Sequence, residues 1–364
     1  MKAIGIGGAG SKIAATFDAN ATIVNVSEVE LNKVQTQGLR IPANLRDNAG
    51  VFQGSRMDPE IGLEAYGSVR RQLKSLVKGS LVFTATGGGT GNGITRGILE
   101  DLSKADEIAV EEKTLFGLIL PYARLESEEF VSNTSNFISG PVAEAIDSGN
   151  TGNIFMFSNR CKFEQRIPES RYNQMLIESL NDFLAVPVKN EKLESLEGHL
   201  DQADFALFLS KPYFNHFCIF DYDSNNDFGK QLNQNQNQLL LSPEQPIEAL
   251  FMLEVPEGSN GDIHYNIVEY FNQQGVKPLY SVVRNPELRA PRVTVAILYS
   301  RIPAELVKNY NQVAEAHAQN KVRKTLEQYV KAEPLQVNLE DEAKKVQPEG
   351  QQDILAMLRR LNKL

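Results

Sequence analysis

The sequence predicts an α/β protein with a doubly wound parallel-sheet domain, a central helix, a smaller α+β domain with a mixed sheet, and a C-terminal helix and tail. Two observations predict the first domain. Short apolar runs alternate with segments of helical length as far as residue 165, and two glycine clusters each lie between such a run and a helix. A third observation predicts the mixed sheet: four apolar runs follow between residues 215 and 300, and three of them are four or more β-prone residues long.

The elements of the first domain follow in a regular order. Apolar runs with strand length are KAIGI (2–6), ATIVNV (21–26), SLVFTA (80–85), TLFGLILP (114–121) and NIFMFSN (153–159). Helices are expected over roughly 10–19, 63–78, 92–104 and 126–147. The stretch 38–62 reads as mainly loop up to the start of the second of these helices.

The second half of the chain begins with a helix from about 169 to 185, which Pro187 interrupts. A polar, acidic stretch (190–205) precedes the four apolar runs, and QLNQNQNQ (231–238) is expected to be a solvated loop. A long helix is expected over 303–330, followed by a Pro/Glu/Lys-rich segment. The predicted domains are 1–168, 169–209 (central helix and acidic loop), 210–302 and 303–364.

Composition narrows the class of protein. The chain is 41% hydrophobic and 23% charged, which is ordinary for a globular protein. A net charge of −9 argues against direct nucleic-acid binding, although one nucleotide can be held by backbone amides and Mg²⁺. We expect no disulfide framework from Cys161 and Cys218 and no signal peptide, and no apolar run reaches membrane length. We expect a cytoplasmic protein without membrane insertion.

The two glycine clusters are GIGGAGS (5–11) and GGGTGNG (87–93), and each opens a predicted helix. A helix N-terminus presents unpaired amides and a partial positive charge, which suit phosphate oxygens. Neither cluster carries the lysine of a phosphate-binding P-loop. Taken alone, either cluster is more simply a tight turn.

One alternative explains the first cluster only. Gly5, Gly7 and Gly10 satisfy the GxGxxG pattern, and Glu28 lies near the end of the second strand, where a dinucleotide-binding fold keeps its ribose-binding acid. An NAD(P)-dependent enzyme of Rossmann type is therefore the main rival hypothesis. It leaves GGGTGNG without a role.

Both clusters together resemble a known family. GGGTGNG resembles the GGGTG(S/T)G signature of the tubulin/FtsZ superfamily, and GIGGAGSK (5–12) resembles the GxGGAGxN opening of FtsZ. The resemblance implies that both loops wrap the phosphates of GTP. Thr90 would offer a hydroxyl, and Asn92 stands where the family prefers Ser or Thr. The residues expected to contact nucleotide here are Gly7, Gly8, Ala9, Gly10, Ser11, Gly87, Gly88, Gly89, Thr90, Gly91, Asn92 and Gly93.

Two further segments resemble nucleotide-binding loops of this family. VNVSEVELNKV (24–34) is similar to its NTDxxxL segment, with Asn25 retained and Ser27 in place of the Asp that has a Mg²⁺-linked role. GSRMDPEIG (54–62) resembles the GAGxxPExG loop that senses the γ-phosphate, which implies a contact from Glu60. By itself, DPEIG also predicts a helix start with Asp58 as the N-cap.

The remaining nucleotide contacts are carried over from the same resemblance. Glu126 in LPYARLESEE (120–129) would bind the ribose, and Asn159 at a strand end would bind the guanine. In IESLND (177–182), Ile177 would pack on the base and Asn181 would read its edge. Without the resemblance, Asn159 caps a strand and Ile177 packs in a core.

The acidic stretch EGHLDQADF (197–205) resembles the NxDxxD segment of FtsZ and keeps both acids as Asp201 and Asp204. Such a pair is otherwise an ordinary solvated face. The resemblance implies that this loop enters the site of the next subunit and polarises the attacking water. Asp201 and Asp204 would then be the catalytic residues of an assembly-dependent GTPase that uses Mg²⁺, and no protein side chain is assigned as a metal ligand.

The divergent loops and short length are most similar to phage- or plasmid-encoded tubulins. The predicted protein is a head-to-tail homopolymer that positions or segregates phage or plasmid DNA or particles, with an adaptor or cargo protein as a further partner. In segment 339–364, we expect a helix with an apolar face at Ile354, Leu355, Leu358 and Leu361 that docks on the next subunit. The alternatives for this segment are a helix that packs on its own domain and a frayed tail. The alternatives are the NAD(P) enzyme and a non-hydrolysing nucleotide-binding module.

Overall fold

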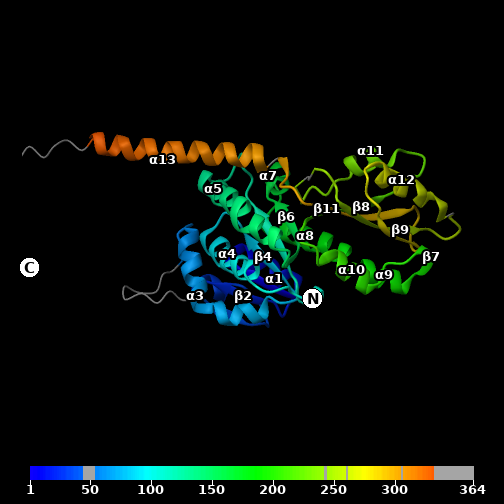
Figure 1. The fold of residues 1–364 in the computed structure, drawn as a ribbon, viewed down its shortest axis with the longest axis horizontal. Helices are drawn as coiled ribbons and strands as arrows, with labels where there is room; N and C mark the ends of the chain where they lie inside the picture. Colours follow the sequence, from blue (N-terminus) through cyan, green and yellow to red (C-terminus); the bar gives the residue numbers. More distant parts are fainter. Residues whose placement is uncertain (44–53, 242–243, 260, 305, 332–364) are drawn as a thin grey trace, which may run out of the picture. The chain divides into compact units, whose positions relative to one another are not determined.

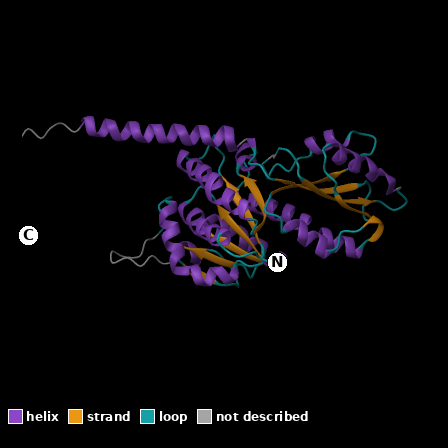
Figure 2. Cartoon of the chain, in the orientation of Figure 1, coloured by secondary structure: helices purple, strands orange, loops and turns teal. Residues whose placement is uncertain are grey.

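The computed structural model describes residues 1–43, 54–241, 244–259, 261–304 and 306–331. The chain divides into two compact units, Met1–His317 and Ala318–Leu364, and the first contains the sheet and the site. Figure 1 shows the fold, and Figure 2 shows how its helices and strands are distributed. The segment 339–364, with its expected docking face, lies outside the described residues.

The first half of the sheet is parallel and doubly wound, as predicted. Its strands run in the order β3-β2-β1-β4-β5-β6, and each neighbouring pair is parallel. The strands are β1 (Lys2–Ile6), β2 (Thr22–Asn25), β3 (Arg40–Pro42), β4 (Ser80–Ala85), β5 (Thr114–Leu120) and β6 (Thr151–Ser158). The short edge strand β3 falls in the stretch expected to be loop.

Helices cover both faces of these strands. They are α1 (Gly7–Phe17), α2 (Glu28–Lys33), α3 (Pro59–Leu76), α4 (Gly89–Ser103), α5 (Glu128–Phe137) and α6 (Ala143–Ser148). Alternate strand residues enter separate cores: Val82 packs with residues of α3 and α4, whereas Leu81 and Phe83 pack with residues of α1 and α8 (Glu169–Leu184). The single helix expected over 126–147 is broken by a π-helical turn at Ile138–Val142, which contains Pro141.

The second half of the sheet is mixed, as predicted. It continues past β6 in the order β8-β11-β9-β10-β7, with β11 antiparallel to β8 and β9, β10 parallel to β9, and β7 antiparallel to β10. The five strands are β7 (Glu194–Gly198), β8 (Phe214–Asp221), β9 (Glu248–Val255), β10 (Leu279–Arg284) and β11 (Arg292–Tyr299). Since β8 pairs with β6 at Ile154 and Phe214, the described residues form one continuous sheet.

In the chain, the helices of the second half lie between β6 and β11, except α13, which follows β11. They are α7 (Arg160–Glu164), α8, α9 (Val186–Lys192), α10 (Gln202–Leu209), α11 (Phe228–Gln234), α12 (Tyr265–Gln273) and α13 (Asn311–Lys331). The expectation of a solvated loop at 231–238 is wrong in its first half. That half belongs to α11, where buried Gln231 exchanges hydrogen bonds with the backbone of Asp223. None of the helices in the described ranges is long and apolar enough to cross a membrane.

Candidate nucleotide-binding site

A cavity of about 500 Å³ lies where β1 and β4 end and α1 and α4 begin. The strand order reverses at this point, because the chain runs from β1 out to β3 and returns to β4 on the other side of β1. Such a switch point is where open α/β sheets bind ligands. The described residues lining it are Ile6, Gly7, Gly8, Ala9, Ile13, Glu30, Gly54, Ser55, Arg56, Met57, Ala85, Gly87, Gly88, Gly89, Thr90, Gly91, Ile119, Pro121, Glu126, Phe130, Asn159, Lys162, Glu169, Tyr172 and Asn173.

The N-terminus of α1 forms one wall of this cavity. The helix begins at Gly7, and no described side chain caps its start, so its first amides are available to a ligand. Gly7 has φ +72°, and a Cβ there would lie 3.0 Å from the backbone nitrogen of Gly91. The two glycine loops therefore touch, which requires a glycine at position 7.

The residues that follow on α1 have a structural role. A Cβ on Gly10 would lie 2.2 Å from the carbonyl oxygen of Phe83, so Gly10 allows α1 to pack against β4. Ser11 is buried, and its hydroxyl donates to the carbonyl oxygen of Gly5 over 3.3 Å. Gly10 and Ser11 lie behind the loop and are not among the described lining residues.

The N-terminus of α4 forms the facing wall. Gly88 is its N-cap and Gly89 its first residue, again without a described side-chain cap. Gly87 to Gly91 all line the cavity. Gly93 lies one turn further on, where a Cβ would meet the carbonyl oxygen of Pro59 at 2.1 Å, so this glycine serves the contact between α3 and α4.

Asn92 points away from the cavity. It is 3% exposed, and its side-chain amide donates to the carbonyl oxygens of Thr86 (2.6 Å) and Asn133 (3.2 Å). The Asn133 amide in turn donates to the carbonyl oxygens of Met57 (2.9 Å) and Gly87 (3.0 Å). These two amides tie the second glycine loop to α5 and to the 54–58 loop.

The segment before α3 lies beside the second glycine loop. Thr90 donates a hydrogen bond to the Ser55 hydroxyl over 3.1 Å. Asp58 caps α3 by accepting from the amide of Glu60 over 2.9 Å, which confirms the predicted N-cap. The Glu60 side chain is exposed and pairs with Arg96 at 2.8 Å, and Glu60 is not among the described lining residues.

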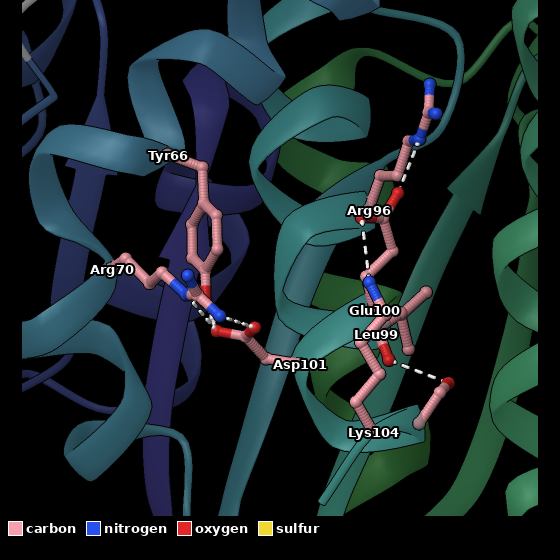
Figure 3. A network of polar contacts seen from close by, with 8 residues as sticks. Tyr66, Arg70, Arg96, Leu99, Glu100, Asp101 and Lys104 are labelled. Carbon is pink, nitrogen blue, oxygen red and sulfur yellow. Dashed lines mark hydrogen bonds and ion pairs between the residues drawn. The ribbon is translucent and has the colours of Figure 1, made fainter.

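A polar network holds α3 against α4 (Figure 3). Asp101 accepts from the Tyr66 hydroxyl (2.7 Å) and from two nitrogens of Arg70 (2.8 and 2.5 Å). The hydrogen bond from Arg70 lowers the pKa of Asp101, while burial, reinforced by Asp101, raises the pKa of Tyr66. Asp101 is therefore an ionised anchor between the two helices that carry the 54–58 loop and the second glycine loop.

The segment after β2 brings a carboxylate to the cavity that sequence analysis missed. Buried Asn25 donates to a carboxylate oxygen of Glu30 over 2.9 Å and accepts from the Ser27 amide, while Ser27 caps α2. Glu30 lines the cavity beside Gly8, whereas Asn25 and Glu28 are not among the described lining residues. The sequence feature that could have identified Glu30 is its position one helical turn after Ser27, the N-cap of α2.

The other end of the cavity carries the residues expected at the ribose and base. Glu126 and Asn159 both line it, and the Asn159 amide donates to the Glu126 carboxylate at 3.0 and 3.2 Å. The Glu126 carboxylate also accepts from the backbone amide of Tyr122. Lys162 on α7 and Glu169 at the start of α8 complete this end.

The structure places Ile177 and Asn181 away from the cavity. Ile177 is 3% exposed in the core, and Asn181 is exposed to solvent. Asn173, one turn before Ile177 and two turns before Asn181, lines the cavity instead. Burial raises the pKa of neighbouring Tyr172, whose hydroxyl donates to the carbonyl oxygen of Ser158 and so fixes the first turn of α8. Among the described residues, only the first turns of α8 line the cavity, and the later turns lie away from it. The sequence spacing alone did not indicate which turn of this helix would face the cavity.

The two acids of the 197–205 segment lie at the start of α10. Asp201 is the N-cap, and its carboxylate accepts from the Asp204 amide over 2.8 Å. Both side chains are partly exposed, and neither is among the described residues that line the cavity of the same chain. The structure therefore separates the predicted catalytic acids from the predicted nucleotide site.

No family model and no curated protein matches the chain. Solved structures do match. The GTPγS-form protofilament of TubZ from Bacillus thuringiensis serovar israelensis matches with a TM-score of 0.70 at 13% identity, over 89% of this chain and 94% of that one. GDP-bound CetZ1 from Haloferax volcanii matches at 0.61 and 19% (88% and 100%), and an empty FtsZ dimer from M. jannaschii at 0.57 and 16% (82% and 88%).

Proposed function

Because the chain has the tubulin/FtsZ fold, we propose that it binds GTP, hydrolyses it to GDP and phosphate, and polymerises head to tail into filaments. One observation carries the proposal. Two glycine-rich helix starts, at Gly7 and Gly89, face the same cavity and bring their free amides together without a P-loop lysine. Such a double cradle suits a chain of phosphates better than a single anion.

The cavity has distinct ends that match the parts of a nucleotide. The phosphates would lie against Gly7–Ala9 and Gly87–Gly91. The Thr90 hydroxyl, which donates to Ser55 in this structure, would turn its proton to a phosphate oxygen. The ribose and base lie toward Glu126, Asn159 and Asn173, whose carboxylate and amide groups can accept from and donate to hydroxyls and a guanine edge.

A Mg²⁺ ion fits the phosphate end through Glu30. The described residues contain no group of three or more Asp, Glu, His or Cys that could hold a metal by themselves. Nucleotide-bound Mg²⁺ needs only one or two carboxylates besides phosphates and water. A Cβ placed on Gly8, in the first glycine loop, would lie 3.1 Å from a carboxylate oxygen of Glu30, so this carboxylate lies against the loop that would bind the phosphates. When bound, the ion would neutralise phosphate charge.

Hydrolysis would be completed between subunits. In the reaction, a water oxygen forms a bond to the γ-phosphorus, the bond from that phosphorus to the β–γ bridging oxygen breaks, and the water loses a proton. Asp201 and Asp204 are partly exposed acceptors at the start of α10, outside their own cavity. We assign them to the cavity of the next subunit, where they would orient the water and accept its proton.

Exposed apolar side chains support a head-to-tail contact. Val29, Met57 and Leu125, which are 57%, 41% and 65% exposed, lie on the cavity loops or next to cavity residues. Leu207 is 50% exposed and lies one turn after Asp204 on α10, so both share a helix face. Two different surfaces of this kind form a heterologous, repeating interface. The TubZ relatives are described as a protofilament and a two-stranded filament.

The proposal extends to role and location, by analogy with TubZ. We propose a cytoplasmic filament that positions phage or plasmid DNA or particles through an adaptor or cargo protein. The alternative, an NAD(P) enzyme, is favoured by the strand order 3-2-1-4-5-6 of the parallel half, which dinucleotide-binding folds share. It leaves the second glycine loop without a ligand, and its ribose acid Glu28 is not among the described lining residues.

The experiment begins with the nucleotide. Purified protein is denatured and the released base identified. Guanine nucleotide supports the proposal, whereas NAD(P) would overturn it in favour of the alternative. The protein is then sedimented with GTP, with GDP and without nucleotide, while phosphate release is measured against protein concentration. We expect pelleting with GTP and a specific activity that rises with concentration, because the site is completed by assembly. A constant specific activity with no pelleting would contradict the proposal.

A further inference from the structure

The loop before α3 contains two successive non-glycine residues in the left-handed region of backbone space. Arg56 has φ 50° and Met57 has φ 64°, and no other adjacent pair of this kind occurs in the described ranges. Non-glycine residues adopt such angles rarely, and long side chains more rarely still. Strained backbone of this sort concentrates at functional sites, where surrounding contacts hold it in place.

The surroundings of this loop do hold it in place. The Ser55 hydroxyl accepts from Thr90, and the Met57 carbonyl accepts from the Asn133 amide, which also bonds Gly87. The last residue of the loop, Asp58, caps α3, and α3 is anchored to α4 through Asp101. The loop conformation is therefore held by the second glycine loop and by contacts with α3, α4 and α5.

The charged residues that line the cavity indicate what Arg56 could do there. The charged residues among the described lining are Glu30, Arg56, Glu126, Lys162 and Glu169. Lys162 belongs to the ribose end, since it lies on α7 just after Asn159 and covers the Phe163 ring at 4.8 Å. Among the described lining residues, Arg56 is thus the cation at the glycine end. A guanidinium matches phosphate oxygens with two parallel hydrogen bonds and keeps its charge at every working pH.

The resemblance of residues 54–62 to the family loop also supports a role for Arg56. In the GAGxxPExG loop that residues 54–62 resemble, the position of Arg56 is a glycine. A glycine would adopt a φ of 50° without strain. This chain carries an arginine at a position where glycine fits the backbone better, and this exposed residue is one of those that line the glycine end of the cavity.

We propose that Arg56 is a catalytic residue of this site, which binds the terminal phosphate of GTP from within the same subunit. Its guanidinium neutralises the negative charge that grows on the β–γ bridging oxygen and the γ-phosphoryl oxygens while the water attacks. This inference rests on the proposed GTPase function. The glycine loops carry no cation, and Arg56 on the separate 54–58 loop would supply one. Arg56 would make this contact only while the γ-phosphate is present.

The test compares Arg56→Gly, Arg56→Lys and a matched control, Arg71→Ala. Arg71 is an exposed arginine on α3 that does not line the cavity. Arg56→Gly relieves the backbone strain and removes the charge, so we expect an unfolding midpoint at or above that of wild type. We expect GTP turnover to fall about 1,000-fold or more, the lower end of what a transition-state arginine supplies. The GTP turnover of Arg56→Lys should lie between those of wild type and Arg56→Gly, and that of Arg71→Ala should match wild type.

A second readout separates phosphate contact from loop packing. Wild type and Arg56→Gly are titrated with GTPγS and with GDP. We expect the preference for GTPγS over GDP to drop at least tenfold in Arg56→Gly, with GDP affinity unchanged. Wild-type turnover and preference in Arg56→Gly would overturn the inference while leaving the GTPase proposal intact. A wild-type protein that neither binds nor hydrolyses GTP would overturn the proposed function itself.

Discussion

Replacing Asp201 separates its structural role from its proposed catalytic one. The carboxylate of Asp201 accepts from the Asp204 amide at the start of α10, which is a helix cap. Asparagine caps a helix as well as aspartate does, whereas alanine loses about 1 kcal/mol. Asp201→Asn therefore removes the charge and keeps the cap, and Asp201→Ala removes both.

The two effects differ in size. The loss of the cap is limited to about 1 kcal/mol, because Phe205, Phe208 and Leu209 remain buried and hold α10 in place. Loss of a positioned base lowers the rate about 10²- to 10⁴-fold, which is roughly 3–5.5 kcal/mol of activation free energy. We expect both variants to hydrolyse GTP at least 100-fold more slowly, and only Asp201→Ala to unfold more easily in urea.

A mixing assay tests whether the acid acts on a neighbour. Gly8→Asp places a negative charge at the phosphate end, where the neighbouring atoms belong to the flexible Glu30 side chain. This variant keeps its acidic loop and loses its nucleotide site, whereas Asp201→Asn keeps its site. Each alone should be inactive, and mixtures should recover turnover as they co-sediment. Co-sedimenting mixtures that recover nothing would refute action in trans, and wild-type turnover by Asp201→Asn would refute any catalytic role.

Three further predictions concern the support of the site. Asn92→Ala should lower the free energy of unfolding by about 1–3 kcal/mol because it leaves a buried carbonyl without a donor; an unchanged urea midpoint would argue against this structural role. Gly10→Ala should yield insoluble or unfolded protein, since its Cβ would lie 2.2 Å from the carbonyl oxygen of Phe83; a normal circular dichroism melt would contradict this. Asp101→Asn should be less stable than wild type above pH about 4, the unfolded pKa of Asp. Because Arg70 lowers the folded pKa of Asp101, the difference should vanish as pH falls through that lower value, and a difference that persists in acid would count against the ion pair.

The parts that could be predicted from sequence depend on local signals. The glycine loops follow strands and open helices, so their backbone role can be inferred from neighbours in the chain. Asp58 followed by proline predicts a capped helix start for the same reason. Alternating strands and helices likewise predict the parallel sheet and, through it, the edge at which a ligand would bind.

The site residues that could not be predicted are those whose position depends on how a helix is oriented relative to the cavity. Asn173, Ile177 and Asn181 lie one turn apart on α8, and only the angle of that helix decides which of them meets the cavity. Asn92 belongs to the glycine loop in sequence, yet the rotation of α4 turns its amide inward to Thr86. Glu30 needed the placement of α2 beside Gly8 before its carboxylate could be assigned.

The lysine missing from the second glycine loop would have a physical consequence for the proposed assembly. A P-loop lysine is carried by the same loop and helix start that cradle the phosphates, whereas Arg56 lies on a separate strained loop that hydrogen bonds hold against α4 and α5. A contact from Arg56 to the γ-phosphate would add to those bonds, and its loss after hydrolysis would leave the strain less opposed. Met57, the next residue, is exposed at the rim that we assign to the neighbouring subunit. The state of the nucleotide would therefore be transmitted to the subunit contact through two adjacent residues, and Arg56→Gly should weaken the dependence of filament stability on GTP rather than GDP.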